Sequence, residues 1–310
     1  MSDIKIFSIQ KEICDVIKGK EDVVKKVLAV VFAGGHILLD DIPGVGKTTL
    51  AMSVARSMSL NYKRIQFTPD VLPSDIVGFS MYNNVTNEFE YREGAVFCNL
   101  FLADEINRTS PKTQSALLEV MEEGNVTVDG ITHKLPSPFT VIATQNPIGS
   151  SGTQLLPESQ LDRFMVCLSL GYPGHADSIE ILRNVVNPPV NDIKPIITTD
   201  ELMFIRNNVD DVYVSDCILD YITSLIEATR SNDYISLGSS PRGAINVLKL
   251  SKAIALMNNQ DYVTPENISY IFCDVLRHRI KLSSKAKAEG LSADDVLTSV
   301  FNTIPVPKGN

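Results

Sequence analysis

A glycine-rich loop between an apolar strand and a helix constrains this 310-residue chain more than any other feature. Residues 36–40 form a short apolar run, residues 41–48 read Asp-Ile-Pro-Gly-Val-Gly-Lys-Thr, and helical spacing follows over 47–58. A strand, a glycine turn and a helix N-terminus in this order favour phosphate, because backbone N–H groups and the helix dipole face the anion. The loop nearly matches the G-x-x-x-x-G-K-[ST] pattern of nucleotide-binding loops.

The positions of the loop have separate expected roles. Gly44 and Gly46 allow backbone N–H groups to approach the phosphates closely. Lys47 is expected to reach the β- and γ-phosphates, and the Thr48 hydroxyl to bind Mg²⁺. Asp41 replaces the first glycine of the pattern, so its carboxylate is expected to point away or to pair with a cation. The loop residues predicted to bind nucleotide are Pro43, Gly44, Val45, Gly46, Lys47, Thr48 and Thr49.

Two further apolar strands end in polar residues. Residues 100–105 read Leu-Phe-Leu-Ala-Asp-Glu, which places two acids at the carboxyl end of a buried strand, where ligands of parallel sheets bind. Asp104 is predicted to hold Mg²⁺, and Glu105 to polarise an attacking water. Phosphate transfer to a second substrate does not need that second acid, so Glu105 favours hydrolysis. Residues 141–147 read Val-Ile-Ala-Thr-Gln-Asn-Pro, another buried strand that ends in polar residues. Asn146 is expected to hold the water or the γ-phosphate; an Asn-Pro turn is the alternative.

Arginines in the second half of the chain are candidates for phosphate contacts. Arg163, in Leu-Asp-Arg-Phe, suits the charge that develops on a transferred phosphoryl group, supplied from a neighbouring subunit. A salt bridge with Asp162 or another acid is the alternative. Arg242 follows Ser240 and Pro241 at a predicted helix start and could close the second domain onto the nucleotide, unless it is simply exposed. Arg108 is a further interface candidate, with a pair to a nearby acid as the alternative.

The order of elements predicts two domains. Strands expected at 36–40, 63–67, 99–103 and 139–144 alternate with helical patterns, including 5–17 and 21–33, which is typical of a parallel α/β sheet. Insertions are expected at 79–97 and at 124–135, the second a hairpin around Asp129-Gly130. Beyond the turn cluster at 171–174 the patterns are helical: 175–186, 199–208, 215–231, 242–258, 265–280 and 292–302. We therefore predict a nucleotide-binding α/β domain at 1–173 and a helical domain at 174–310.

Composition limits the classes of partner. The formal net charge of −9 argues against a dedicated nucleic-acid-binding protein. The basic run at 277–281, with Lys285 and Lys287, is interpreted as a solvated helix face. The five cysteines form no C-x-x-C pair, which leaves zinc unsupported. No apolar leader opens the sequence, and the apolar stretch at 27–39 is too short to span a bilayer, so a cytoplasmic protein without membrane insertion is expected.

Together these segments resemble a MoxR-type AAA+ ATPase, over about residues 5–307. The motifs that carry the resemblance are Asp41-Ile-Pro-Gly-Val-Gly-Lys-Thr-Thr49, Gln66-Phe-Thr-Pro-Asp-Val-Leu-Pro-Ser-Asp75, Leu102-Ala-Asp-Glu-Ile-Asn-Arg108, Thr113-Gln-Ser-Ala-Leu-Leu-Glu119, Ala143-Thr-Gln-Asn-Pro147, Leu156-Pro-Glu-Ser-Gln-Leu-Asp-Arg-Phe164 and Gly238-Ser-Ser-Pro-Arg242.

The resemblance implies a P-loop AAA+ nucleotide-binding α/β domain followed by an all-helical lid. It implies a ring, commonly hexameric, with ATP and Mg²⁺ at the subunit interfaces. Asn146 would be sensor one, Arg163 the arginine finger and Arg242 sensor two, and Lys18-Gly19 would lie beside the adenine. The two insertions would be the helix-two insert and the pre-sensor hairpin, and the family often carries an acid at the position of Asp41.

The resemblance also implies a function. Family members act as chaperone-like remodelling ATPases, often with a partner that bears a von Willebrand factor A domain; the client protein is unknown. The magnesium-chelatase ATPase subunit, which uses the same machinery, is the main alternative. A nucleic-acid motor or transcription activator and a nucleotide-gated scaffold that barely hydrolyses ATP are the others.

Overall fold

A five-stranded parallel sheet forms the centre of the computed structural model, which describes residues 2–146, 156–184 and 188–307. The strand order is β2-β5-β8-β1-β9, and each neighbouring pair is parallel. The strands are β1 (Ile37–Asp40), β2 (Tyr62–Gln66), β5 (Leu100–Asp104), β8 (Thr140–Gln145) and β9 (Val166–Leu168). β5 is buried up to Ala103 and β8 is buried along its whole length, because both of their faces are covered.

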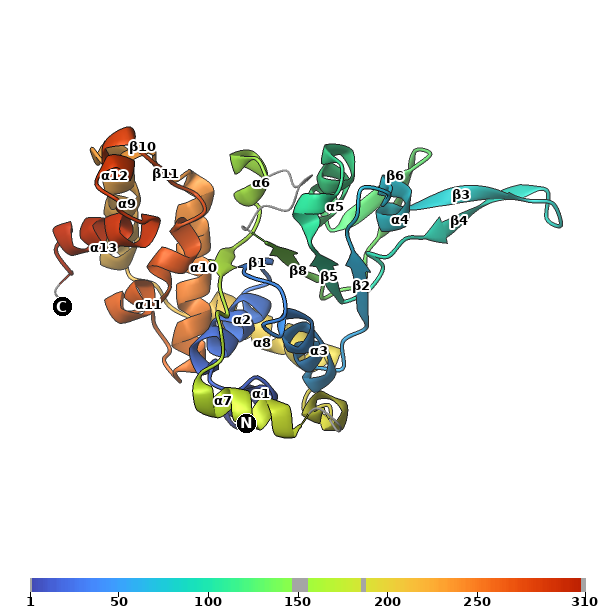
Figure 1. Cartoon of the computed structure of the whole chain (residues 1–310), viewed down its shortest axis with the longest axis horizontal. Coiled ribbons are helices and arrows are strands. Elements are labelled where there is room, and N and C mark those ends of the chain that lie inside the picture. Colours follow the sequence, from blue (N-terminus) through green and yellow to red (C-terminus); the bar gives the residue numbers. More distant parts are fainter. Residues whose placement is uncertain (1, 147–155, 185–187, 308–310) are drawn as a thin grey trace.

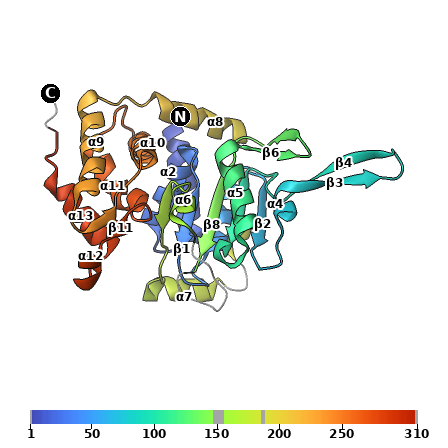
Figure 2. The ribbon, with the colours of Figure 1, turned by 90° about the horizontal axis from the view of Figure 1, so that it is seen from above.

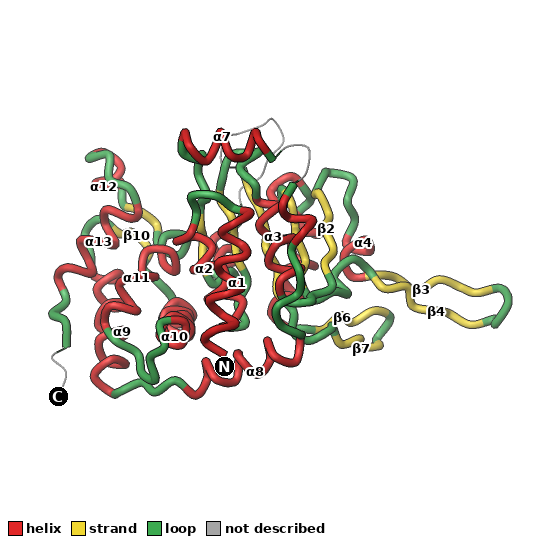
Figure 3. The backbone as a smooth tube through the Cα atoms, turned by 90° about the horizontal axis from the view of Figure 1, so that it is seen from below, coloured by secondary structure: helices red, strands yellow, loops and turns green. Residues whose placement is uncertain are grey.

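Helices cover both faces of the sheet. On one face lie α1 (Ser2–Val16), α2 (Glu21–Phe32) and α3 (Lys47–Ser57), which appear together in the tube view (Figure 3). On the other lie α4 (Pro73–Val77) and α5 (Pro111–Glu123). Successive side chains of β5 alternate between the two layers: Leu102 packs in the core beneath α1 to α3, and Phe101 in the core beneath α5. The short helices η1 (Ile106–Arg108), α6 (Glu158–Leu161) and η2 (Pro189–Asp192) lie in the connections.

Two antiparallel hairpins interrupt the α/β order, where the sequence predicted insertions. β3 (Gly78–Asn83) pairs with β4 (Glu88–Glu93), and this hairpin projects far from the body of the molecule (Figures 1 and 2). β6 (Asn125–Val128) pairs with β7 (Ile131–Lys134) around Asp129 and Gly130, whose φ angles are both positive. The Tyr91 and His133 rings stack at 3.8 Å and join the two hairpins.

The C-terminal half is helical, as predicted. Its helices are α7 (His175–Arg183), α8 (Thr199–Asp211), α9 (Asp216–Ser231), α10 (Pro241–Met257), α11 (Pro265–Leu276), α12 (Ser284–Ala288) and α13 (Ala293–Thr303). Residues 185 and 186 of the first predicted helix lie outside the described residues. Helix α12 and the antiparallel pair β10 (Ile235–Leu237) and β11 (Lys281–Leu282) were not predicted, because elements this short show no periodicity.

The interpretation of the basic run as a solvated helix face is wrong for its arginines, whereas Lys281, Lys285 and Lys287 are exposed, the last two on α12. The Arg279 side chain is 1% exposed, and its Nε donates to Asp162 Oδ1 at 2.8 Å. Arg277 pairs with Asp274 at 2.9 Å and Asp294 at 3.0 Å. The run follows α11, where the chain packs against the segment before β9. The two guanidinium groups therefore pair with acids and carbonyl groups inside the molecule. No helix within the described residues is long and apolar enough to cross a membrane.

Candidate active site

The loop between β1 and α3 forms an open cradle. Gly44 has a φ of +83° and Gly46 a φ of +97°, which L side chains rarely adopt. A Cβ built on either glycine meets no heavy atom within 4 Å, so the loop leaves space rather than packing inward. Helix α3 begins at Lys47, directly after this turn. The loop therefore presents backbone N–H groups and a helix N-terminus to an open volume, as a phosphate requires.

Lys47 and Asp41 are held inside the loop by backbone atoms. Lys47 is 9% exposed, and its Nζ donates to the Asp41 carbonyl at 2.8 Å. Burial lowers the pKa of this lysine. The Asp41 carboxylate accepts the N–H groups of Leu170 at 2.5 Å and Gly171 at 2.8 Å. It therefore points away from the nucleotide side, the first of the two arrangements expected for it, and it connects the loop to the segment after β9.

One cavity of about 410 Å³ collects the predicted phosphate and metal groups. It is lined by Pro43, Gly44, Gly46, Lys47, Thr48, Thr49, Arg64, Gln66, Asp104, Glu105 and Asn146. Parallel strands bring these residues together, because β1, β5 and β8 end at the same edge of the sheet. Thr48 and Asp104 both line the cavity and supply hard oxygen donors, so the residues fit Mg²⁺ with phosphate oxygens and waters as its other ligands.

The two strand-end acids have defined partners. Asp104 accepts the Thr144 hydroxyl on Oδ1 at 2.6 Å and Arg64 on Oδ2 at 2.6 Å. The carboxylate of Glu105 pairs with Arg108 at 2.6 Å, which is the nearby-acid alternative for that arginine. Glu105 adopts a left-handed conformation with φ 58° and ψ 46°. A non-glycine residue in this region is strained and is typical of functional sites.

Arg64 and Thr144 were missed by sequence reasoning. Both lie on strands of the sheet, Arg64 on β2 and Thr144 on β8, beside the strand that ends in Asp104. The only signal was their position near strand ends, since hydrogen-bond partners 40 residues apart leave no local pattern.

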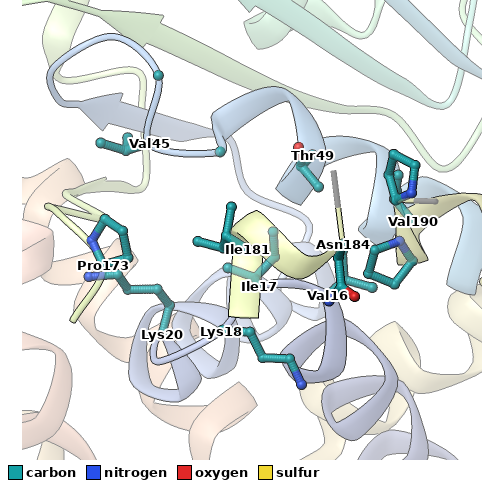
Figure 4. A pocket seen from close by; sticks show the side chains of 14 residues that line it. Val16, Ile17, Lys18, Lys20, Val45, Thr49, Pro173, Ile181, Asn184 and Val190 are labelled. Carbon is teal, nitrogen blue, oxygen red and sulfur yellow. The ribbon is translucent and has the colours of Figure 1, made fainter. Parts of the chain in front are cut away.

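A second, apolar cavity adjoins the loop (Figure 4). Ile17, Val45, Pro173, Ile181 and Val190 are among its lining residues, and Figure 4 shows Ile17 beside Ile181 below the loop. Apolar side chains on facing elements suit the flat faces of a nucleotide base.

The predicted adenine-side residues lie at this cavity. Lys18 lines it and pairs with Glu180 at 3.1 Å, a hydrogen bond that raises the pKa of the lysine. Gly19 has a φ of +68°, and a Cβ there would lie 2.2 Å from a carboxylate oxygen of Asp177. Gly19 thus allows α7 to approach the turn between α1 and α2.

Arg163 and Arg242 lie elsewhere. Arg163 Nη1 donates to the Leu118 carbonyl at 2.5 Å, and its Nη2 lies 3.3 Å from Glu122. Arg242 pairs with the same Glu122, and more loosely with Asp162 at 3.8 Å. Both arginines line one cavity, and among the described residues neither lines the cavity of the glycine loop. Arg242 therefore lies away from the glycine loop of the same chain, because the lid packs through α11 against β9 and through α10 against α2.

The fold and the cavity define a P-loop nucleotide hydrolase with a helical lid. Family models agree: one described as "ATPase family associated with various cellular activities (AAA)" matches residues 36–166, and "AAA lid domain" matches residues 227–300. YeaC of Bacillus subtilis is 46% identical over 94% of this chain and 92% of its own length. Chaperone MoxR1 of Mycobacterium tuberculosis is 38% identical over 96% of this chain and 81% of its own.

A solved structure agrees with these relatives. The crystal structure of an ATPase candidate from Cytophaga hutchinsonii superposes with a TM-score of 0.92 at 39% identity, covering 99% of this chain and 96% of that one. The chain therefore belongs to the MoxR-type AAA+ ATPases, and its activity is ATP hydrolysis. The sequence resemblance and the predicted fold are confirmed.

Proposed function

We propose that this chain hydrolyses ATP with Mg²⁺ in a ring of identical subunits, hexameric as is common in the family, and that each site is completed by a neighbour. The observation that carries the proposal is that Arg163 and Arg242 lie away from the cavity of the glycine loop. The cavity of the glycine loop contains the phosphate-binding lysine and both acids, whereas Arg163 and Arg242 lie together on another face. The arginine that does line the glycine-loop cavity, Arg64, is bound to Asp104 at 2.6 Å, so we propose that the arginine that stabilises the transition state comes from a second copy.

Each residue of the cavity has a role in this proposal. Lys47 and the loop N–H groups hold the β- and γ-phosphates, and Asn146 orients the γ-phosphate or the water. Glu105 accepts a proton from the attacking water while the water oxygen bonds to the γ-phosphorus, the bond from that phosphorus to the β–γ bridging oxygen breaks, and ADP leaves. Thr48 and Asp104 hold Mg²⁺, which neutralises phosphate charge when bound. Lys18, Gly19, Val45 and Thr49 border the adenine side. Residue 173 remains our boundary between nucleotide-binding domain and lid.

The work done with the ATP is proposed to be chaperone-like remodelling of a client protein. The name of the Mycobacterium tuberculosis relative, Chaperone MoxR1, supports this class of activity. A partner with a von Willebrand factor A domain is part of the proposal, and nucleic acid is not. A cytoplasmic location, where ATP is supplied and thiols stay reduced, suits five free cysteines.

The test is the Mg²⁺-dependent ATP hydrolysis rate per subunit over a wide range of protein concentration, with Glu105→Gln as the blank. The rate should rise with concentration, because the site needs a neighbour. A constant rate from a chain that stays monomeric by sedimentation would contradict the shared site. A rate equal to the blank would favour a nucleotide-gated scaffold.

Mixed subunits test the origin of the arginine. Arg163→Ala and Lys47→Ala should each be inactive alone, and mixing them should restore part of the rate. In a mixed ring the first supplies an intact loop and the second an intact arginine. If well-mixed rings stay inactive, Arg163 does not act on a neighbour. The magnesium-chelatase-like alternative shares this chemistry and differs in its client, so a client-capture experiment separates it.

A further inference from the structure

Arg163 and Arg242 line a cavity together with a third positively charged residue, Lys249. This cavity, of about 280 Å³, lies between the start of β1, the end of α5 and one face of α10. Arg242, Asn246 and Lys249 follow one another on that face of α10 at helical spacing, and all three line the cavity. Because the spacing brings them to one side of the helix, the cavity has a basic wall that adjoins Arg163.

The charges in this cavity are unbalanced. Glu122 is the acid among its lining residues, and it is shared between Arg163 and Arg242. Lys249 is exposed, and within the described part of the chain it has no hydrogen bond or ion pair. On a protein with a formal net charge of −9, three cations around one carboxylate make an uncommon local excess of positive charge.

We propose that Lys249 is a further phosphate-contacting residue: beside Arg163 and Arg242, it contacts the triphosphate held in the glycine loop of a second copy. The inference rests on the proposed function and extends it from two cations to three. Glu122 holds both guanidinium groups near each other before the second copy arrives. The phosphates then replace Glu122 as the partner of the arginines.

The residue types suit this exchange. Guanidinium groups pair with carboxylate and with phosphate in similar geometry, so Arg163 and Arg242 can pass from Glu122 to the anion. Lysine is a compact charge on a flexible stem, so Lys249 can reach a phosphate oxygen from two turns along α10. Glu122 therefore competes with the nucleotide for the two arginines.

The primary test is nucleotide-dependent assembly, measured by sedimentation velocity with ATP and Mg²⁺ on full-length chains that carry Glu105→Gln to prevent turnover. Adding Lys249→Ala should raise the protein concentration at half-assembly about tenfold, the loss of one charge-assisted contact. Lys252→Ala is the matched control, because this lysine lies on the same helix and donates to the Asp210 carbonyl at 2.7 Å, away from the cavity. Its half-assembly should stay unchanged.

Glu122→Gln gives a change of opposite sign. Removing the competing carboxylate should lower the concentration at half-assembly about threefold, a shift of under 1 kcal/mol. A purely structural role of Glu122 would raise it instead, since both arginines would lose their support. A raised value would therefore overturn the competition between Glu122 and the phosphates.

The outcomes separate this inference from the proposed function. If the Glu105→Gln parent stays monomeric with ATP at every concentration, the ring fails and the inference fails with it. If the parent assembles and Lys249→Ala behaves like Lys252→Ala, the ring stands and the role of Lys249 is wrong. Mixing Lys249→Ala with Lys47→Ala, both with Glu105 intact, adds a check, because a hydrolysis rate above the sum of the two variants alone requires that Lys249 acts on the neighbour's nucleotide.

Discussion

Glu105 is the residue on which hydrolysis most directly depends. Glu105 lines the cavity that contains Lys47 and Thr48, so Glu105→Gln should bind ATP normally and lose hydrolysis by about 10²–10⁴-fold, the contribution of a general base. The measurements are binding of a fluorescent ATP analogue and single-turnover hydrolysis. Glu289→Gln, an exposed acid of the lid, is the control. Normal turnover in Glu105→Gln would remove Glu105 as the base.

Asp41 should matter for stability, although it points away from the nucleotide. Its carboxylate accepts the N–H groups of Leu170 and Gly171, and Asp41 is 5% exposed. Asp41→Ala leaves two shielded donors without that partner and should lower the free energy of unfolding by about 2–4 kcal/mol. Urea unfolding monitored by circular dichroism measures this. Asp70→Ala, at an exposed position, should change it little, and equal stability of the two variants would contradict the role of Asp41.

Local motifs predicted most of the candidate site residues but not their partners. Lys47, Thr48, Asp104, Glu105 and Asn146 follow strands or glycines in patterns readable from a few neighbouring positions. Arg64 and Thr144 were missed. For Asp41 the sequence indicated two possible arrangements of the carboxylate but not its partners. In each case the partners are distant in the chain. For Arg242 the sequence predicted the helix start but not which part of the molecule the residue faces. That orientation of the lid depends on packing between α11 and β9, which no local pattern indicates.

At the scale of elements, the turn before β1 should make stability depend on pH. His36 precedes β1 and connects it to two other elements, β8 and α5. Its Nδ1 accepts the Val141 N–H of β8, and its Nε2 donates to the Met121 carbonyl of α5. Burial lowers the pKa of His36 from 6.5 to about 4, and the positive charge of Arg206 acts in the same direction. Burial also lowers the pKa of His278.

Both histidines bind protons more readily when unfolded. Stability should therefore fall as the pH drops below about 6.5, and His36 accounts for up to about 3 kcal/mol by pH 4. Urea unfolding at pH 7.5, 6 and 5 measures the slope. His36→Gln should unfold more easily at pH 7.5 but show a flatter slope over the same range. An unchanged slope would show that His36 does not titrate as described.

Strands and long helices were the elements that the sequence predicted well. The four predicted strands and the six lid helices agree with the structure to within a few residues, because apolar runs and helical spacing reflect burial directly. β9 was missed, since three apolar residues before a turn cluster carry no period. The reach of the β3–β4 hairpin was also beyond prediction: turn residues indicated an insertion, but no local pattern says how far a hairpin extends.

At the scale of the whole molecule, the two domains share one hydrophobic core. Val27 and Leu28 of α2 belong to the same buried cluster as Val247 of α10 and Phe272 of α11. Calorimetry of the full chain should therefore give one cooperative transition with equal calorimetric and van't Hoff enthalpies. A fragment of residues 1–173 should lack this transition, because it exposes the face of α2 that α10 covers. Two separate transitions in the full chain, the first matching that fragment, would show that the lid folds independently and that the shared core adds little.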